Sequence, residues 1–166
     1  ARSQWNELLK RPVMDLSEIE PRVTPILQAV KEEGDKALKA YTARFDGVEL
    51  EDILVPEADM QAAADLLSQE LEDAIQLAHD NIASFHSRQK GEVLEVETMP
   101  GVRCWRKSVA IQRVGLYIPG GTAPLFSTIL MLGVPARIAG CDEVVLCTPP
   151  DKEGQVHPAI RYTAQL

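Results

Sequence analysis

Residues 114–147 read VGLYIPGGTAPLFSTILMLGVPARIAGCDEVVLC, and this stretch decides the fold. Its first part, residues 114–118, predicts a buried strand, because a short apolar run that ends at proline and glycine is typical of strands inside α/β sheets. The apolar run over residues 123–139 predicts a helix, and residues 143–147 predict a second buried strand. A strand, a glycine turn, a helix and a strand in this order predict the start of a parallel α/β unit.

The glycine turn between the first strand and the helix is the candidate ligand site. Ligands of open α/β sheets bind beyond the carboxyl ends of the strands, and Gly120 and Gly121 carry no Cβ atom that would keep a ligand away from the backbone. Thr122 can cap the following helix, whose N-terminus favours an anion such as a pyrophosphate. The spacing matches neither the dinucleotide fingerprint G-x-G-x-x-G nor the phosphate loop that ends in Gly-Lys-Ser/Thr. On spacing alone, a connecting turn is as good an interpretation as a binding turn.

The residues before this stretch predict mainly helices. Apolar residues recur at helical spacing, and capping residues mark where the helices begin and end. These signals predict a short helix within residues 3–11, two helices that meet at Gly34-Asp35, a short helix after Pro56 and a long helix from Ser68 to Gly91. A short strand is expected at residues 53–55.

Several aromatic and aliphatic side chains on these helices are interpreted as core residues. Tyr41 and Phe45 recur at helical spacing, and aromatic residues in that pattern are more often buried than in contact with a ligand. The long helix predicts one apolar stripe, formed by Leu71, Ala74, Ile75, Ala78, Ile82 and Phe85.

Residues 93–109 predict a β-hairpin that turns at Pro100-Gly101 and leads into the parallel part. Cys104 lies in this hairpin and has no neighbouring base or helix N-terminus to activate its thiol, so it is interpreted as structural. Cys141 and Cys147 are interpreted as small, buried, apolar residues.

The histidines do not predict a metal site. His79 and His86 lie on the long helix, separated by about two turns or 10 Å along its axis, which is too far for one ion. They are interpreted as surface or boundary residues, and His157 follows a loop without a visible partner.

Charge and composition exclude several classes of function. The net charge of −8 argues against nucleic acid as a partner, because phosphates require a basic protein face. Three cysteines without paired spacing fit a reducing cytoplasm rather than a disulfide framework. Pro135 and Arg137 interrupt the longest apolar run, so no membrane span is expected.

Residues 115–128, GLYIPGGTAPLFST, resemble the signature of the histidinol dehydrogenase family. The resemblance continues through residues 135–141 and 144–150, and upstream it includes residues 34–38, 41–46, 81–86 and 100–104. It extends from about residue 8 to residue 166. Because members of that family are much longer than this chain, a fragment is expected.

The resemblance implies a cytoplasmic, homodimeric oxidoreductase of histidine biosynthesis. Such an enzyme oxidises L-histidinol to L-histidine through an aldehyde, with two NAD per turnover and a bound zinc ion. In the family, the tyrosine of the Tyr-Ile-Pro-Gly-Gly string contacts NAD, so Tyr117 is the expected cofactor contact, with Pro119 and Gly120 beside it. The family's general-base Glu-His pair and its zinc ligands come from later in the sequence, so no catalytic residue and no metal ligand is expected in this chain.

Pattern and resemblance together predict an α/β protein in two parts. Residues 1–110 form a helix-rich segment with a β-hairpin and short strands, and residues 111–166 begin a parallel, Rossmann-like domain that contacts NAD and is incomplete. Two other functions stay open: a phosphate-ligand binding module that uses the Gly120-Gly121 turn without catalysis, and a helical protein-interaction domain. Titration with NAD separates these two, and the intact mass of the native protein separates both from a dehydrogenase.

Overall fold

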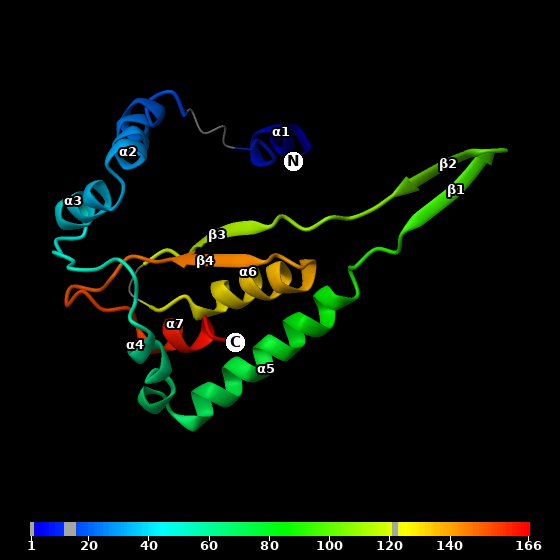
Figure 1. Cartoon of the computed structure of the whole chain (residues 1–166). Coiled ribbons are helices and arrows are strands. Elements are labelled where there is room, and N and C mark those ends of the chain that lie inside the picture. The colour runs from blue at the N-terminus through cyan, green and yellow to red at the C-terminus, as the bar shows by residue number, and fades with distance from the viewer. Residues whose placement is uncertain (1, 12–15, 121–122) are drawn as a thin grey trace. The chain divides into compact units, whose positions relative to one another are not determined.

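The computed structural model describes residues 2–11, 16–120 and 123–166, and it has the mixed helices and strands of an α/β protein (Figure 1). Gly121 and Thr122, which the sequence analysis assigned to the glycine turn and the helix cap, lie outside the described residues. The chain divides into two compact units, residues 1–41 and residues 42–166. A domain boundary near residue 110 stays a prediction. None of the helices in the described part is long and apolar enough to cross a membrane.

The first unit is helical. Its elements are a 3-10 turn, α1, α2 and the larger part of α3: Arg2–Gln4, Trp5–Leu8, Glu20–Glu33 and Asp35–Phe45. Gly34 has a φ of +58°, which L side chains rarely adopt, and it separates α2 from α3. Its N–H donates to the carbonyl of Val30 at 2.9 Å, and its own carbonyl accepts from the N–H of Ala37 at 3.0 Å. The predicted pair of helices that meet at Gly34 is therefore confirmed.

The interpretation of Phe45 as a core residue is wrong. Its side chain is 59% exposed, and the guanidinium of Arg44 lies 5.2 Å from the centre of its ring. Phe45 is the last residue of α3, and the chain turns at Gly47, which has a φ of +75°. No further turn of the helix therefore follows Phe45 to cover its ring. Tyr41, one turn earlier, is half-buried.

The second unit begins with α4, a 3-10 turn and the long helix α5, which cover Glu57–Gln61, Ala64–Leu66 and Gln69–Ser87. Ser68 caps α5 as predicted, because its hydroxyl accepts the N–H of Leu71 at 3.3 Å. The strand expected at residues 53–55 is wrong: the chain bends there, and Leu54 is 84% exposed. Pro56 follows directly and has no N–H to donate to a strand ladder.

The hairpin that follows α5 is confirmed. Strand β1, Leu94–Met99, pairs antiparallel with β2, Val102–Arg106, and Gly101 turns between them with a φ of +81°. Every residue of both strands is exposed. Within the described residues, the hairpin is held by its own backbone pairs, its turn and an ion pair between Arg103 and Glu95.

The parallel α/β unit is also confirmed. Strand β3, Arg113–Tyr117, pairs parallel with β4, Glu143–Cys147, and α6, Phe126–Ala139, connects them (Figure 1). Gly140 ends α6 with a φ of +90°, as predicted. The helix begins later than residue 123, because Pro124 disfavours a helical conformation at the residue before it.

The core of the second unit lies between one face of the parallel strands and the helices α5, α6 and α7, which covers Pro158–Thr163. Two clusters of buried side chains form it: Ile75, Leu130 and Val134, and then Ile118, Ile129 and Ile160. The strands alternate between half-buried and exposed residues, so the prediction that they are buried holds for one face only. We call the exposed face, with Gly115, Tyr117, Val145 and Cys147, the outer face.

The apolar stripe of α5 is confirmed in its middle and wrong at its end. Ile75 is completely buried, and Ile82 packs against the same cluster, whereas Phe85 is 64% exposed. At 100° per residue, Phe85 lies about 80° around the helix from Ile75, while Ile82 lies about 20° from it. Ala83 lies about 80° from Ile75 in the other direction and packs against the same cluster, so the covered stripe is displaced around the helix from the predicted one.

The last helix ties the end of the chain to α4. Arg161 on α7 is only 8% exposed, and its Nη1 donates to the carbonyl of Asp59 at 2.8 Å. Gln165 donates from Nε2 to the carbonyl of Met60 at 2.7 Å. These two side chains bridge residues that lie more than a hundred positions apart in the sequence.

Candidate functional site

The loops that follow β3 and β4 leave from the same edge of the parallel pair. Tyr117 is the register partner of Cys147, and one residue further the N–H of Ile118 donates to the Cys147 carbonyl at 2.9 Å. Ile118 is completely buried, so the chain is anchored immediately before it turns at Pro119. Both loops therefore start from fixed points, at the edge where parallel α/β sheets bind ligands.

Tyr117 lies on the outer face at this edge and is 65% exposed. Gly115 lies two residues earlier on the same face, with open space where a Cβ would be. Val145 and Cys147 are the exposed residues of β4 nearest to Tyr117, and the exposed Glu143 lies at the other end of the strand. Small and apolar neighbours therefore leave the ring and hydroxyl of Tyr117 accessible. A phenol at a strand end can pack on a cofactor ring and can hydrogen-bond a ribose.

Pro119 and Gly120 are exposed at the start of the turn. A Cβ added to Gly120 would lie 2.5 Å from Cγ of Pro149, which is far inside van der Waals contact. The loop after β4 thus touches the loop after β3 at this glycine. The sequence analysis missed Pro149. Its signal was the proline pair at residues 149–150, which directly follows the second predicted strand.

Residues 114–120 and 144–150, which form the carboxyl ends of β3 and β4 and the start of the loops after them, include no Asp, Glu, Lys or Arg. The ion pair between these strands lies at the opposite, amino edge, where Nε of Arg113 is 3.0 Å from Oε2 of Glu143. The polar groups of these two segments are backbone groups, the hydroxyls of Tyr117 and Thr148 and the thiol of Cys147. Such an edge suits a ligand recognised through backbone hydrogen bonds and ring contacts rather than through ion pairs.

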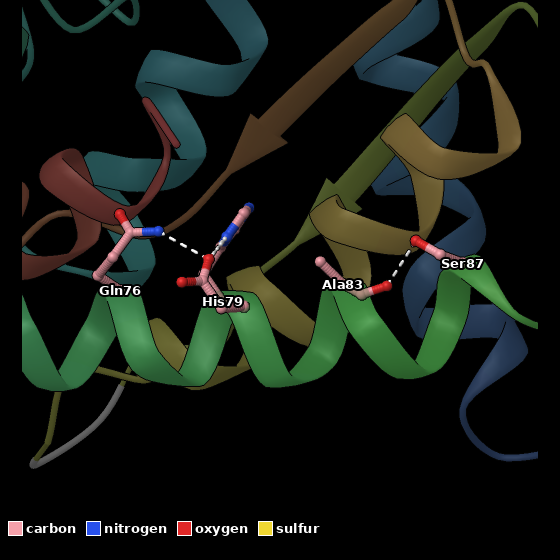
Figure 2. A network of polar contacts seen from close by, with 5 residues as sticks. Gln76, His79, Ala83 and Ser87 are labelled. Carbon is pink, nitrogen blue, oxygen red and sulfur yellow. Dashed lines mark hydrogen bonds and ion pairs between the residues drawn. The ribbon is translucent and has the colours of Figure 1, made fainter.

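His79 belongs to a small polar network on α5 (Figure 2). Its Nδ1 lies 3.0 Å from Oδ1 of Asp80, and Gln76 donates from Nε2 to the same oxygen at 2.9 Å. The hydrogen bond from His79, and after it the one from Gln76, hold the pKa of Asp80 below its usual value. This network lies on α5, which contributes none of the residues at the carboxyl edge of β3.

The other two histidines also have local partners. Nδ1 of His86 lies 2.7 Å from Oε1 of Gln89. Nδ1 of His157 accepts the N–H of Ala159 at 3.1 Å and so caps α7, a role that the sequence analysis did not find. Within residues 2–11, 16–120 and 123–166, no group of three or more His, Cys, Asp or Glu side chains could hold a metal ion.

The cysteines differ from their interpretation in one respect. Cys147 is exposed on the outer face of β4, so its interpretation as a small buried residue is wrong. The cause is that α6 covers only the opposite face of the strands. Cys141 is half-buried, and Cys104 is exposed on the hairpin.

A family model described as histidinol dehydrogenase matches residues 9–166. The chain belongs to the histidinol dehydrogenase family. Histidinol dehydrogenase of Bacteroides thetaiotaomicron is 55% identical over 166 residues, which cover 100% of this chain and 39% of the relative. Histidinol dehydrogenase of Bacteroides fragilis is 54% identical over 165 residues, which cover 99% of this chain and 39% of that relative.

A solved structure agrees with these relatives. The crystal structure of histidinol dehydrogenase from Elizabethkingia anophelis matches with a TM-score of 0.93 at 48% identity, over 99% of this chain and 38% of that chain. The chain therefore spans less than half of the length of the histidinol dehydrogenases it matches. The resemblance found in the sequence is confirmed at the level of the family. That Tyr117, Pro119 and Gly120 contact NAD stays a prediction.

Proposed function

We propose that the full-length protein that contains these residues oxidises L-histidinol to L-histidine through histidinal, with NAD and a bound zinc ion. Membership of the histidinol dehydrogenase family over residues 9–166 is the observation that carries this proposal. Within that protein, the residues described here contribute one wall of the NAD site, at the carboxyl edge of β3. A cytoplasmic homodimer that acts in histidine biosynthesis belongs to the same proposal.

The described residues fit NAD at this edge. The exposed ring and hydroxyl of Tyr117 suit a cofactor ring or a ribose, and Gly120 has no side chain between its backbone and a ligand. When bound, NAD supplies the hydride acceptor. The task of Tyr117 and the turn at Pro119 is to hold that acceptor in one orientation, because hydride transfer requires the two reacting carbons to be kept in contact.

The described residues do not fit the zinc ion, since they contain no cluster of metal-binding side chains. We assign the zinc ligands and the proton-accepting Glu-His pair to parts of the full-length protein outside these residues. The 166-residue chain alone is then expected to form no NADH from histidinol at alkaline pH, even with zinc and NAD added. Measurable NADH formation by the purified chain would disprove this assignment.

Replacement of Tyr117 in the full-length enzyme tests the proposed cofactor wall. Tyr117→Phe removes only the hydroxyl, so the NAD dissociation constant should rise several-fold, corresponding to about 0.5–1.5 kcal/mol. Tyr117→Ala should weaken NAD binding further, because the ring contact is lost as well. Zinc content should remain unchanged in both variants, because the metal ligands lie elsewhere. Titration with NAD and metal analysis measure these effects.

A matched control separates binding from folding. Ile111→Ala alters an apolar side chain that is 70% exposed and precedes β3, and it should leave the NAD dissociation constant unchanged. If Tyr117→Ala lowers the melting temperature but binds NAD like the wild type, the ring only packs the turn. Tyr117 would then be removed from the cofactor site.

A further inference from the structure

A neighbouring side chain, and not a positive φ angle, excludes a side chain at Gly120. Five described glycines have a positive φ, a conformation that disfavours other residues: Gly34, Gly47, Gly101, Gly140 and Gly154. Gly120 is not among them, so its φ does not by itself exclude a side chain. The space for that side chain is already filled, because a Cβ would lie 2.5 Å from Cγ of Pro149 and 3.6 Å from its Cβ and Cδ.

The ring of Pro149 can move aside only by a change of pucker or a shift of its backbone. A proline ring closes on its own backbone, so its Cγ cannot rotate away as the end of a long side chain can. Thr148 precedes a proline and is restricted to extended conformations, and Pro150 fixes a further φ angle. Residues 148–150 are half-buried, and the hydrogen bond from Ile118 to Cys147 anchors the strand end before them. The loop after β4 is thus a rigid surface beneath Gly120.

We propose that Pro149 is a positioning residue of the NAD site. Its ring sets where the turn at Pro119 and Gly120 lies relative to Tyr117, and so determines the shape of the surface that receives the cofactor. This inference rests on the proposed function, since it takes NAD to be the ligand of the turn. It adds the loop after β4 to a site that the sequence motif places only after β3.

Three variants of the full-length enzyme test the contact. Gly120→Ala should raise the NAD dissociation constant roughly tenfold, because the new Cβ must push the turn away from the Pro149 ring. Pro149→Ala should raise it only about two- to threefold, through loss of the rigid support. In the double variant the Cγ is gone and the remaining Cβ lies in ordinary contact, 3.6 Å from the added atom. The double variant should therefore bind NAD like Pro149→Ala.

Pro150→Ala is the matched control, because Pro150 provides none of the atoms nearest to the position of the added Cβ. It should bind NAD like the wild type, and an effect equal to that of Pro149→Ala would overturn the inference in favour of general loop stiffness. A double variant as weak as Gly120→Ala would also overturn it, because the added Cβ would then exclude NAD directly. Wild-type affinity in Gly120→Ala would do the same.

Three further outcomes keep the test decisive. If Gly120→Ala does not fold, the double variant decides alone: it should fold and bind NAD as Pro149→Ala does, and tenfold weaker binding contradicts the inference. If Tyr117→Ala leaves NAD affinity unchanged, the proposed cofactor wall itself fails. If Tyr117→Ala weakens binding while the double variant shows no recovery, only the role of Pro149 is wrong.

Discussion

The two small sheets of the second unit, β1–β2 and β3–β4, have opposite relations to the rest of the fold. In the hairpin, strands that are neighbours in sequence pair directly and every residue is exposed. In the parallel pair, α6 lies between the strands in sequence, and half-buried residues alternate with exposed ones. A two-residue turn can join the strands of the hairpin, whereas parallel strands need a crossover connection to meet. Only the parallel pair therefore has loops whose starting points are fixed by a core.

The largest expected difference between the two sheets comes from side-chain packing. Leu130 on α6 is 2% exposed, so Leu130→Ala should lower the free energy of unfolding by about 2–5 kcal/mol. Val96 in the hairpin is 46% exposed, and Val96→Ala should change it by about 0.5 kcal/mol or less. Urea denaturation measures both. Equal losses would show that the parallel pair does not depend on the core beneath it.

Two glycines, one in each part, allow a matched comparison in which the expected loss of stability is smaller. Gly101→Ala in the hairpin and Gly140→Ala after α6 each force a side chain into a positive φ, at a cost of about 1–2 kcal/mol. Amide hydrogen exchange should rise only in β1 and β2 for the first variant, and in α6, β3 and β4 for the second. Gly133→Ala inside α6 is the control, because its Cβ meets no atom within 4 Å and a helix gains about 0.5–1 kcal/mol from this change. Exchange that spreads beyond the hairpin in Gly101→Ala would refute its independence.

The smallest expected effects come from the ion pairs, of which each sheet has one between its strands. Arg103 pairs with Glu95 in the hairpin, and Arg113 pairs with Glu143 in the parallel sheet. All four side chains are largely exposed, so Glu95→Gln and Glu143→Gln should each cost at most about 1 kcal/mol, and less in high salt. At each salt concentration, the melting temperature should fall by the same amount in the two variants relative to the wild type, and the fall should be smaller in high salt. A much larger loss for Glu143→Gln would mean that charge, and not packing, distinguishes the sheets.

Local signals in the sequence predicted most of the elements. Gly34, Ser68 and Gly140 mark helix ends through their own backbone or side-chain chemistry, which depends on few neighbours. Burial was harder to predict, because Phe45 and Phe85 have helical spacing but point where no core forms. Residues 53–55 have a strand-like composition, but the chain bends there, and pairing depends on a partner that a local pattern does not reveal.

The sequence predicted only one of the two loops that form the candidate site, the loop after β3. The string around Tyr117 located the loop after β3 because its residues are contiguous. The contact between Gly120 and Pro149 depends on the parallel register of β3 and β4, which brings distant loops to one edge. No spacing rule within a single segment contains that information. The cap that His157 provides for α7 was missed for a different reason, since imidazole is an uncommon capping group.

The bridge from Arg161 to the carbonyl of Asp59 has a consequence for the order of folding. The two residues are 102 positions apart, and Gln165 and Met60 are 105 apart. During synthesis at about 5–20 residues per second, α4 leaves the ribosome about 5–20 s before α7, its docking partner, exists. The hairpin and α5 have time to form in that interval, because their contacts are local. Docking of α4 therefore follows the formation of α5 and the hairpin, and a ribosome that pauses before α7 would leave α4 without its docking partner and the core without Ile160.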